Sequence, residues 1–322
     1  MKLFLVVMAA AGLFAQQPPV ENAKVEAHAF SGTLEGQLRQ LGPGPFWAGY
    51  SEPIIPGQRG DMCWNNGTNS NAENAPVRLE GPTALVVLLR IENSQVDQLR
   101  VTSPDCRLDG GALPFHWFSG VPAEASLAFL KTQVSEAKGD RAVYPIALHA
   151  GPAAERVLDE LTATSQPERV RERTAFWLGT TRGAKGLETL KRMLAGDPSM
   201  KVREQVVFAI SRSKEPTANA LLIDIAKNDK TPQLRGKALF WLAQKAGAKE
   251  VISNAVSNDP DRSVKEQAVF ALKQLPEDQG VPLLINVAKN NPDAAVRKKA
   301  MFWLGQSKDP RAIEFFAKVL QP

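Results

Sequence analysis

The segment Val170–Leu178 reads Val-Arg-Glu-Arg-Thr-Ala-Phe-Trp-Leu, and its pattern returns four times further along the chain. The later copies begin at Val202, Leu234, Val264 and Val296. Counting between the phenylalanines of the five copies gives spacings of 32, 32, 30 and 32 residues. A fixed period of this length is typical of proteins built by stacking one small unit. The sequence therefore predicts a repeat array over residues 167–322.

Each repeat has the pattern of two helices joined by a short turn. A proline near the start of each unit suits the first turn of a helix and prevents the previous helix from continuing. These prolines are Pro167, Pro198, Pro232, Pro260 and Pro292. The first helix is apolar over most of its circumference, and the second has an apolar stripe. Since neither can bury this surface alone, the pairs are expected to stack into a superhelix.

The starts of three units share a further motif. Asp197–Arg203, Asp259–Lys265 and Asn291–Arg297 have the form Asp/Asn-Pro-x-x-x-Val-Arg/Lys. This motif resembles HEAT repeats, in particular the short bacterial type also found in phycobilisome lyases. The resemblance covers about half of the chain and implies an α-solenoid, but it is unspecific about function. It also implies contacts between Asp and the recurring basic residue of neighbouring units, namely Arg171, Arg203, Arg235, Lys265 and Arg297.

A second periodicity distinguishes odd from even repeats. Trp177, Trp241 and Trp303 follow the phenylalanine in the first, third and fifth units, whereas Ala209 and Ala271 follow it in the others. This alternation indicates duplication of a two-repeat block. It predicts a buried ridge along which large and small side chains of neighbouring first helices interlock. Residues 140–166, which precede the regular units, are interpreted as an atypical N-terminal cap repeat.

Polar residues recur at one position of the second helices. The resemblance to HEAT repeats implies that these helices line the concave surface, so their polar residues predict a binding stripe. The alternative is an ordinary solvated helix face. The residues of this predicted stripe are Arg192, Asp224, Lys227, Asn254, Ser257, Asn286, Lys289 and Lys318.

The first fifteen residues have the pattern of a secretory signal peptide. Lys2 precedes an apolar run from Leu3 to Phe14, and Ala15 is a plausible cleavage point. The run is too short to span a bilayer, and no other stretch reaches that length. We therefore expect an exported protein, periplasmic or extracellular, without stable membrane insertion.

We predict that residues 20–136 form a small α+β domain with an antiparallel sheet. Because the helical repeat array makes up most of the remainder, the whole chain is predicted to be mostly α. Residues 23–29 alternate in polarity like a strand, and residues 84–91 and 96–101 form a predicted hairpin. Residues 34–41 and 121–134 are expected to be helical. The glycine- and asparagine-rich residues 57–73 predict a long loop.

The chain has two cysteines, and both lie in this domain. In an exported protein, Cys63 and Cys106 are best interpreted as one disulfide. The alternative is a metal or thiol site that adds His116 and Asp61 or Asp105. Without a Cys-x-x-Cys motif or paired histidine spacing, no metal or cofactor is predicted.

Aromatic residues also gather in the first domain. They are interpreted as core, with a ligand groove as the alternative. These residues are Phe46, Trp47, Tyr50, Trp64 and Phe115 to Phe118.

The charge distribution and the lack of catalytic motifs favour a binding protein. Residues 20–139 contain 9 Lys and Arg against 13 Asp and Glu, whereas residues 140–322 contain 29 against 21. The chain has no recognisable nucleophile, phosphate-binding or zinc-protease motif, and His28, His116 and His149 are isolated in the sequence. We expect a non-catalytic protein that binds a protein or peptide. The alternatives are an enzyme or small-ligand binder acting through the first domain and, less favoured, a basic nucleic-acid-binding solenoid.

The last helix leaves apolar side chains without an obvious cover. Phe302, Phe315, Phe316 and Val319 are expected to be partly open at that end. An exposed apolar end implies a partner or a second copy of the chain.

Overall fold

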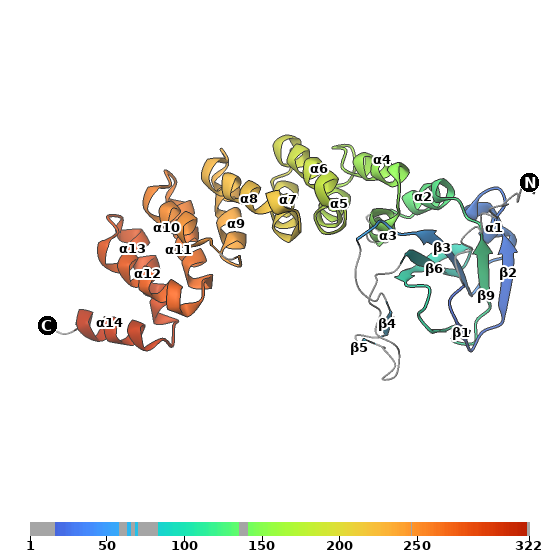
Figure 1. Cartoon of the computed structure of the whole chain (residues 1–322), viewed down its shortest axis with the longest axis horizontal. Helices are drawn as coiled ribbons and strands as arrows, with labels where there is room; N and C mark the ends of the chain where they lie inside the picture. Colours follow the sequence, from blue (N-terminus) through green and yellow to red (C-terminus); the bar gives the residue numbers. More distant parts are fainter. Residues whose placement is uncertain are drawn as a thin grey trace, which may run out of the picture. The chain divides into compact units, whose positions relative to one another are not determined.

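The computed structural model describes residues 17–57, 63–65, 68–69, 83–134, 141–245 and 247–320. The chain divides into two compact units, Met1–Leu161 and Thr162–Pro322 (Figure 1). The predicted signal peptide lies outside the described residues. Along the described parts of the chain, no helix is long and apolar enough to cross a membrane.

The first unit is built on a five-stranded sheet with the strand order β2-β9-β3-β6-β7. Strands β6 and β7 form the predicted antiparallel hairpin, and β3 pairs antiparallel with β6, whereas β9 lies parallel to both β2 and β3. The sheet is therefore mixed, because β9 inserts between two strands that come much earlier in the sequence. The strands are β2 (Val25–Ala29), β3 (Phe46–Pro53), β6 (Ala84–Glu92), β7 (Gln95–Thr102) and β9 (Phe115–Ser119).

Short elements complete the first unit. Two strand pairs lie outside the main sheet, β1 (Val20–Glu21) with β8 (Leu108–Asp109) and β4 (Trp64–Asn65) with β5 (Thr68–Asn69). The last pair falls within the predicted long loop. The helices are α1 (Leu34–Gln40), α2 (Ala123–Thr132), α3 (Val143–Leu148) and α4 (Pro152–Leu161).

Both faces of the sheet are buried by aromatic side chains. Phe115 and Trp117 pack with Val86 and Leu88 on one face, and Tyr50 lies on the other, where its hydroxyl accepts a hydrogen bond from Ser126 of α2 at 2.9 Å. Phe46 and Phe118 are also buried. The interpretation as core is therefore confirmed for these residues, whereas Trp47 is only partly buried and the side chain of Trp64 lies outside the described residues.

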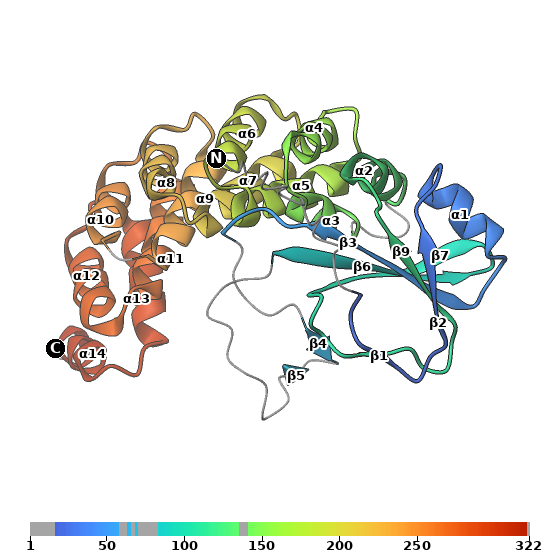
Figure 2. The same ribbon diagram turned by 45° about the vertical axis from the view of Figure 1, so that its right-hand side comes forward.

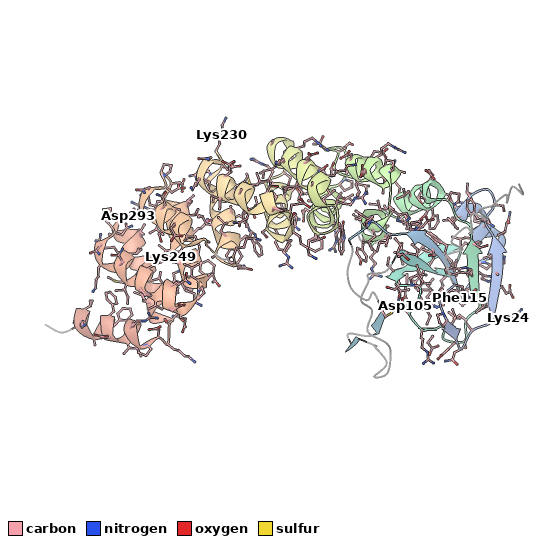
Figure 3. The ribbon with its side chains drawn as sticks, in the orientation of Figure 1. Lys24, Asp105, Phe115, Lys230, Lys249 and Asp293 are labelled. Carbon is pink, nitrogen blue, oxygen red and sulfur yellow. A yellow bond between two sulfur atoms is a disulfide. The ribbon has the colours of Figure 1, made fainter. Side chains whose placement is uncertain are left out.

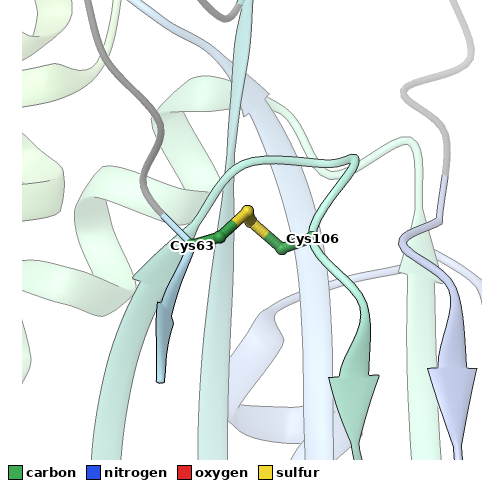
Figure 4. Close-up of a disulfide and its surroundings, with 2 residues drawn as sticks. All are labelled: Cys63 and Cys106. Carbon is green, nitrogen blue, oxygen red and sulfur yellow. A yellow bond between two sulfur atoms is a disulfide. The ribbon is translucent and has the colours of Figure 1, made fainter. Parts of the chain in front are cut away.

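The predicted disulfide is present. Cys63 and Cys106 are bonded, with their Cα atoms 5.4 Å apart (Figure 4). Both cysteines of the chain are thereby used, so the alternative of a metal or thiol site at these residues is wrong. The bond joins the loop after β3 to the segment between β7 and β8.

The second unit consists of paired helices, which confirms the predicted α-solenoid. The first helix of each repeat begins at the repeated motif, and several of these helices have a side-chain N-cap. In one of them, the Asp261 carboxylate accepts hydrogen bonds from the backbone amides of Ser263 and Val264. These first helices are α5 (Glu168–Thr181), α7 (Met200–Arg212), α9 (Pro232–Leu242), α11 (Arg262–Gln274) and α13 (Ala294–Gly305). The second helices are α6 (Gly183–Gly196), α8 (Pro216–Asn228), α10 (Lys249–Asn258), α12 (Glu277–Asn290) and α14 (Pro310–Leu320).

Within the second unit the repeats follow an arc. Figure 2 shows α6, α8, α10 and α12 along its outer side and α7, α9, α11 and α13 along its inner side. Lys230, in the turn after α8, points away from the array (Figure 3). The prediction that the second helices line the concave surface is therefore wrong. Amphipathic periodicity determines which helices pair, but the direction of curvature depends on the small rotation between neighbouring repeats.

The Arg–Asp contacts implied by the HEAT resemblance form at alternate repeats. Arg171 binds Asp197 with nitrogen–oxygen distances of 2.7 and 3.1 Å, and Arg235 binds Asp259 with two of 2.8 Å. These four residues are buried. Arg203 instead donates to the Leu194 carbonyl at 2.8 Å and stands 3.9 Å from its nearest carboxylate.

The last two repeats do not form this ion pair. Arg297 donates to the backbone carbonyls of Asn291 and Pro292 at 2.8 and 3.0 Å. Lys265 has no side-chain ion pair among the described residues. The implied Arg–Asp pairing therefore holds for the first and third repeats, is at most weak in the second, and is absent from the described parts of the last two.

Candidate protein-binding surface

The first helices carry a continuous series of aromatic side chains, which we call the aromatic ladder. Within a repeat the Phe and Trp rings meet edge to face, with centroids 4.8 to 4.9 Å apart. Between repeats Phe176 stacks on Phe208 and Phe240 on Phe270, each at 5.9 Å. Trp241 and Trp303 reach back to the phenylalanine of the preceding repeat at 4.6 and 4.8 Å. The ladder consists of Phe176, Trp177, Phe208, Trp241, Phe240, Phe270, Trp303 and Phe302.

Small residues make this ring contact possible. A Cβ atom on Gly179 would lie 2.3 Å from the Ala209 carbonyl oxygen, so α5 and α7 approach closely just beyond their rings. A tryptophan at position 209 would not fit between such close backbones. The Trp/Ala alternation thus packs neighbouring first helices, as predicted.

The ladder is not the buried ridge that the sequence predicts. All eight side chains are partly or fully exposed, and Phe302 is 54% exposed. The sequence does not reveal this exposure, because these helices are apolar around most of their circumference. No polar face therefore marks which apolar residues are at the surface. A contiguous, partly exposed aromatic surface is a candidate binding site.

Trp241 tests how much of the ladder is structural. Its indole N–H is enclosed and has no acceptor among the described residues, which costs stability. We expect Trp241→Phe to change the free energy of unfolding by less than about 1 kcal/mol, because the ring remains and the unsatisfied donor is removed. Trp241→Ala should cost about 2–3 kcal/mol, less than a fully buried tryptophan, because a cavity forms beside Phe208 and Phe240. Denaturant unfolding measures both; equal losses would show that ring packing there is unimportant.

Charge is distributed unevenly along the ladder. Near its start, Lys201 pairs with Glu172 at 2.7 Å, and Lys237 with Glu204 at 2.9 Å. Near its end, Lys273, Lys298 and Lys299 stand three or four residues from a ladder phenylalanine, on the same helix face. None of these three lysines has an ion-pair partner in the described parts of the chain. Glu266, four residues before Phe270, contributes one negative charge on the same helix face. The end of the ladder is therefore positively charged.

A pocket of about 790 Å³ adjoins this end of the ladder. Trp303 forms part of its wall, Leu275 and Leu284 add apolar surface, and Lys245 and Lys273 stand at its edge with Glu277. The pocket is large enough for a bulky side chain. Ladder and pocket together form a continuous surface with apolar and cationic parts.

The predicted polar stripe is exposed but lies on the outer helices. Several of its polar groups bond within their own helix: Asp224 accepts from Asn228 at 2.7 Å, and Asn286 from Asn290 at 2.7 Å. Arg192 similarly donates to Thr189, and Lys318 pairs with Glu314. Lys227 and Asn254 share a pocket of about 490 Å³, and Lys289 lies over the Phe315 ring at 5.8 Å. The stripe does not lie on the concave side of the array, and its role in binding stays a prediction.

The predicted open C-terminal end is only partly correct. Phe302 and Val319 are exposed, as is Ile313, but Phe315 is buried. Phe315 is covered in part by Lys289 and packs edge to face on Phe316 at 5.3 Å.

The first unit contains a separate polar network around His149. Ser126 is within hydrogen-bond distance of both Tyr50 and His149, and His149 Nδ1 contacts the Pro145 carbonyl at 2.7 Å. Tyr50, Ser126 and His149 are fully buried, and burial raises the pKa of Tyr50. A substrate could not reach these groups, so the network joins α2 and α3 to the sheet rather than forming a catalytic centre.

A smaller pocket of about 180 Å³ lies on the opposite face of the sheet. Trp47, Leu88 and Phe115 line it together with the disulfide, and the Arg100 guanidinium lies over the Trp47 ring at 5.5 Å. Trp47 and Phe115 are thus aromatic residues of the first unit that line a pocket.

The repeats identify the family. A model of HEAT repeats matches residues 154–243 and 250–321, which together make up half of the chain. The chain belongs to the HEAT-repeat family. No curated protein matches its sequence.

Two solved structures show some similarity to this chain. Human deoxyhypusine hydroxylase in complex with glycerol is 18% identical, with a TM-score of 0.27 over 61% of this chain and 78% of that one. The E. coli protein YibA is 23% identical, with a TM-score of 0.35 over 52% of this chain and 64% of that one. These similarities carry no argument about function.

Proposed function

We propose that this HEAT-repeat protein is a non-catalytic scaffold that binds an acidic segment of a partner protein along its aromatic ladder. The observation that carries the proposal is the unbroken series of eight partly exposed rings on the first helices. Four of these helices, α7, α9, α11 and α13, lie along the inner side of the arc (Figure 2). Rigid rings offer a large contact area at low entropic cost, and a solenoid presents such an area over several repeats.

The chemistry of the surface specifies the bound segment. Its apolar side chains would lie against the rings of the ladder, and its largest side chain would enter the pocket beside Trp303. Its carboxylates would face Lys273, Lys298 and Lys299, which form no ion pair in the described parts of the chain. An extended segment that alternates Asp or Glu with Leu or Phe fits these requirements.

We also propose that the protein is exported. The signal-like residues 1–15 and the Cys63–Cys106 disulfide support this, because disulfides persist in oxidising compartments.

Binding of a synthetic peptide to the full chain tests the proposed function. The probe alternates Glu with Leu and Phe, and control peptides replace Glu by Lys or the apolar residues by Ser. We expect the probe alone to bind, and its affinity to fall with added salt. Phe302→Ser and the double substitution Lys298→Glu/Lys299→Glu should each weaken binding by about 10-fold or more, the equivalent of 1.4 kcal/mol.

Ile313→Ser provides the matched control, because Ile313 is equally exposed but lies on α14, outside the ladder. It should leave the affinity unchanged. If all three peptides bind equally, or if Ile313→Ser weakens binding as much as Phe302→Ser does, the ladder is not the binding surface.

A further inference from the structure

Two histidines that are far apart in the sequence meet on the sheet of the first unit. His28 lies on β2 and His116 on β9, and the two strands are paired with Glu26 opposite His116. Since residues two apart on a strand share a face, Glu26 and His28 stand together beside His116. The parallel insertion of β9, which the sequence does not predict, creates this group.

The donor atoms of the three side chains converge. His28 Nε2 and His116 Nδ1 are 2.9 Å apart, and His116 Nδ1 is 3.7 Å from Glu26 Oε2. All three donor atoms lie within 4.8 Å of one another. Ligands about 2.1 Å from a metal ion are roughly 3.0 to 3.4 Å apart when they subtend a right or a tetrahedral angle. The separations of 2.9 and 3.7 Å fit such an ion after shifts of a few tenths of an ångström. The remaining separation, between the His28 and Glu26 donor atoms, is at most 4.8 Å, and it closes if the partly exposed Glu26 carboxylate turns toward His28.

The surroundings hold these side chains in place. Phe46 packs edge to face on the His116 ring at 5.0 Å, and Phe118 packs on the His28 ring at 5.3 Å. Lys24, at the start of β2 (Figure 3), binds Oε1 of Glu26 at 2.7 Å, which leaves Oε2 facing the histidines. Apolar walls on one side and a partly exposed carboxylate on the other are typical of a metal site that remains open to solvent.

We propose that Glu26, His28 and His116 bind one divalent transition-metal ion. Two imidazoles and one carboxylate are a ligand set suited to Zn²⁺, and they leave a coordination position for water or for a donor atom of a ligand. This site is independent of the aromatic ladder, so its failure would leave the proposed function untouched. Both cysteines are held in the disulfide, so no thiolate competes for the ion.

Metal binding to the full, oxidised chain without a polyhistidine tag tests the site. Equilibrium dialysis with Zn²⁺, followed by elemental analysis, should give one ion per chain. Co²⁺ should give a visible absorption spectrum without a thiolate charge-transfer band. Glu26→Gln and His28→Ala should each weaken Zn²⁺ binding by about 100-fold or more, since even residues that only support a ligand typically contribute 10- to 100-fold.

Glu35→Gln is the matched control, because Glu35 is an exposed carboxylate on α1 of the same unit. It should bind Zn²⁺ like the parent. Far-ultraviolet circular dichroism of the His28→Ala and Glu26→Gln variants establishes that they remain folded, and both ligands are partly exposed, so folding should persist. A parent chain that binds no Zn²⁺, or folded variants that bind it as tightly as the parent, would overturn the proposal.

Discussion

Arg235→Ala should lower the free energy of unfolding of the repeat array by about 3–5 kcal/mol, because it leaves a buried carboxylate without its partner. The guanidinium of Arg235 makes two 2.8 Å bonds to Asp259 and a third to the Asp229 carbonyl at 2.9 Å. Asp259 is only 8% exposed; without Arg235 it keeps the hydrogen bond from the Asp261 amide at 2.9 Å but loses its counter-charge. Denaturant unfolding followed by circular dichroism measures the loss.

Arg203→Ala is the internal control, because it removes the same residue type at the equivalent position of the preceding repeat. Its contact with the nearest carboxylate, at 3.9 Å, is too long to be a strong ion pair. The expected loss is about 1 kcal/mol. The double substitution Arg235→Met/Asp259→Leu should recover most of the stability, because apolar side chains replace both charges. Equal losses for Arg203→Ala and Arg235→Ala would contradict this account.

Glu52→Gln should stabilise the first unit at high pH and have almost no effect near pH 4. Glu52 is 1% exposed, and one of its carboxylate oxygens has no hydrogen-bond partner among the described residues. Burial, with a smaller contribution from the charge of Glu124, raises the pKa of Glu52 to about 8. The carboxyl group is therefore neutral in the folded protein at pH 7.

The sign of the effect follows from the two pKa values. Below pH 4.5 the Glu52 carboxyl is protonated in both the folded and the unfolded chain. As the pH rises from 4.5 to about 8, the unfolded chain releases this proton and the folded chain keeps it, so stability falls. Glutamine cannot ionise, so Glu52→Gln should gain roughly 3–5 kcal/mol over the parent above pH 8.

Hydrogen exchange of the β3 and β6 amides reports this difference for the first unit alone. Glu35→Gln, an exposed carboxylate on α1, should change protection by less than about 0.5 kcal/mol at any pH. A Glu52→Gln variant whose advantage over the parent does not grow between pH 4.5 and 8 would show that Glu52 is ionised in the folded protein.

The repeat array could be predicted from the sequence because its signals are local. The recurring phenylalanines, the prolines at helix starts and the apolar faces each specify a helix pair without reference to distant residues. The curvature of the array is a small rotation summed over repeats, and no local pattern encodes it. Asp224 and Asn254 were therefore assigned to the concave side although their helices lie on the outer side.

The candidate sites depend on contacts that the sequence does not reveal. Phe208 and Trp241 have the apolar pattern of core residues, and only the stacking of repeats leaves their rings partly exposed. No motif surrounds His28 or His116 in the sequence, and the two residues are 88 positions apart, so nothing local indicates that they meet. The alternating polarity of residues 23–29 places Glu26 and His28 on one face of a strand, but nothing in the sequence indicates that β2 pairs with β9.

The most direct test of the proposed binding surface is site-specific photocrosslinking of the acidic, apolar peptide to the full chain. A photoreactive phenylalanine analogue replaces Phe302 at the end of the ladder in one variant and Asn254 on the outer helix α10 in another. Both positions are exposed, so neither substitution should disturb the fold. The account predicts crosslinks from position 302 and none from position 254. Crosslinks from position 254, or none from position 302, would contradict it.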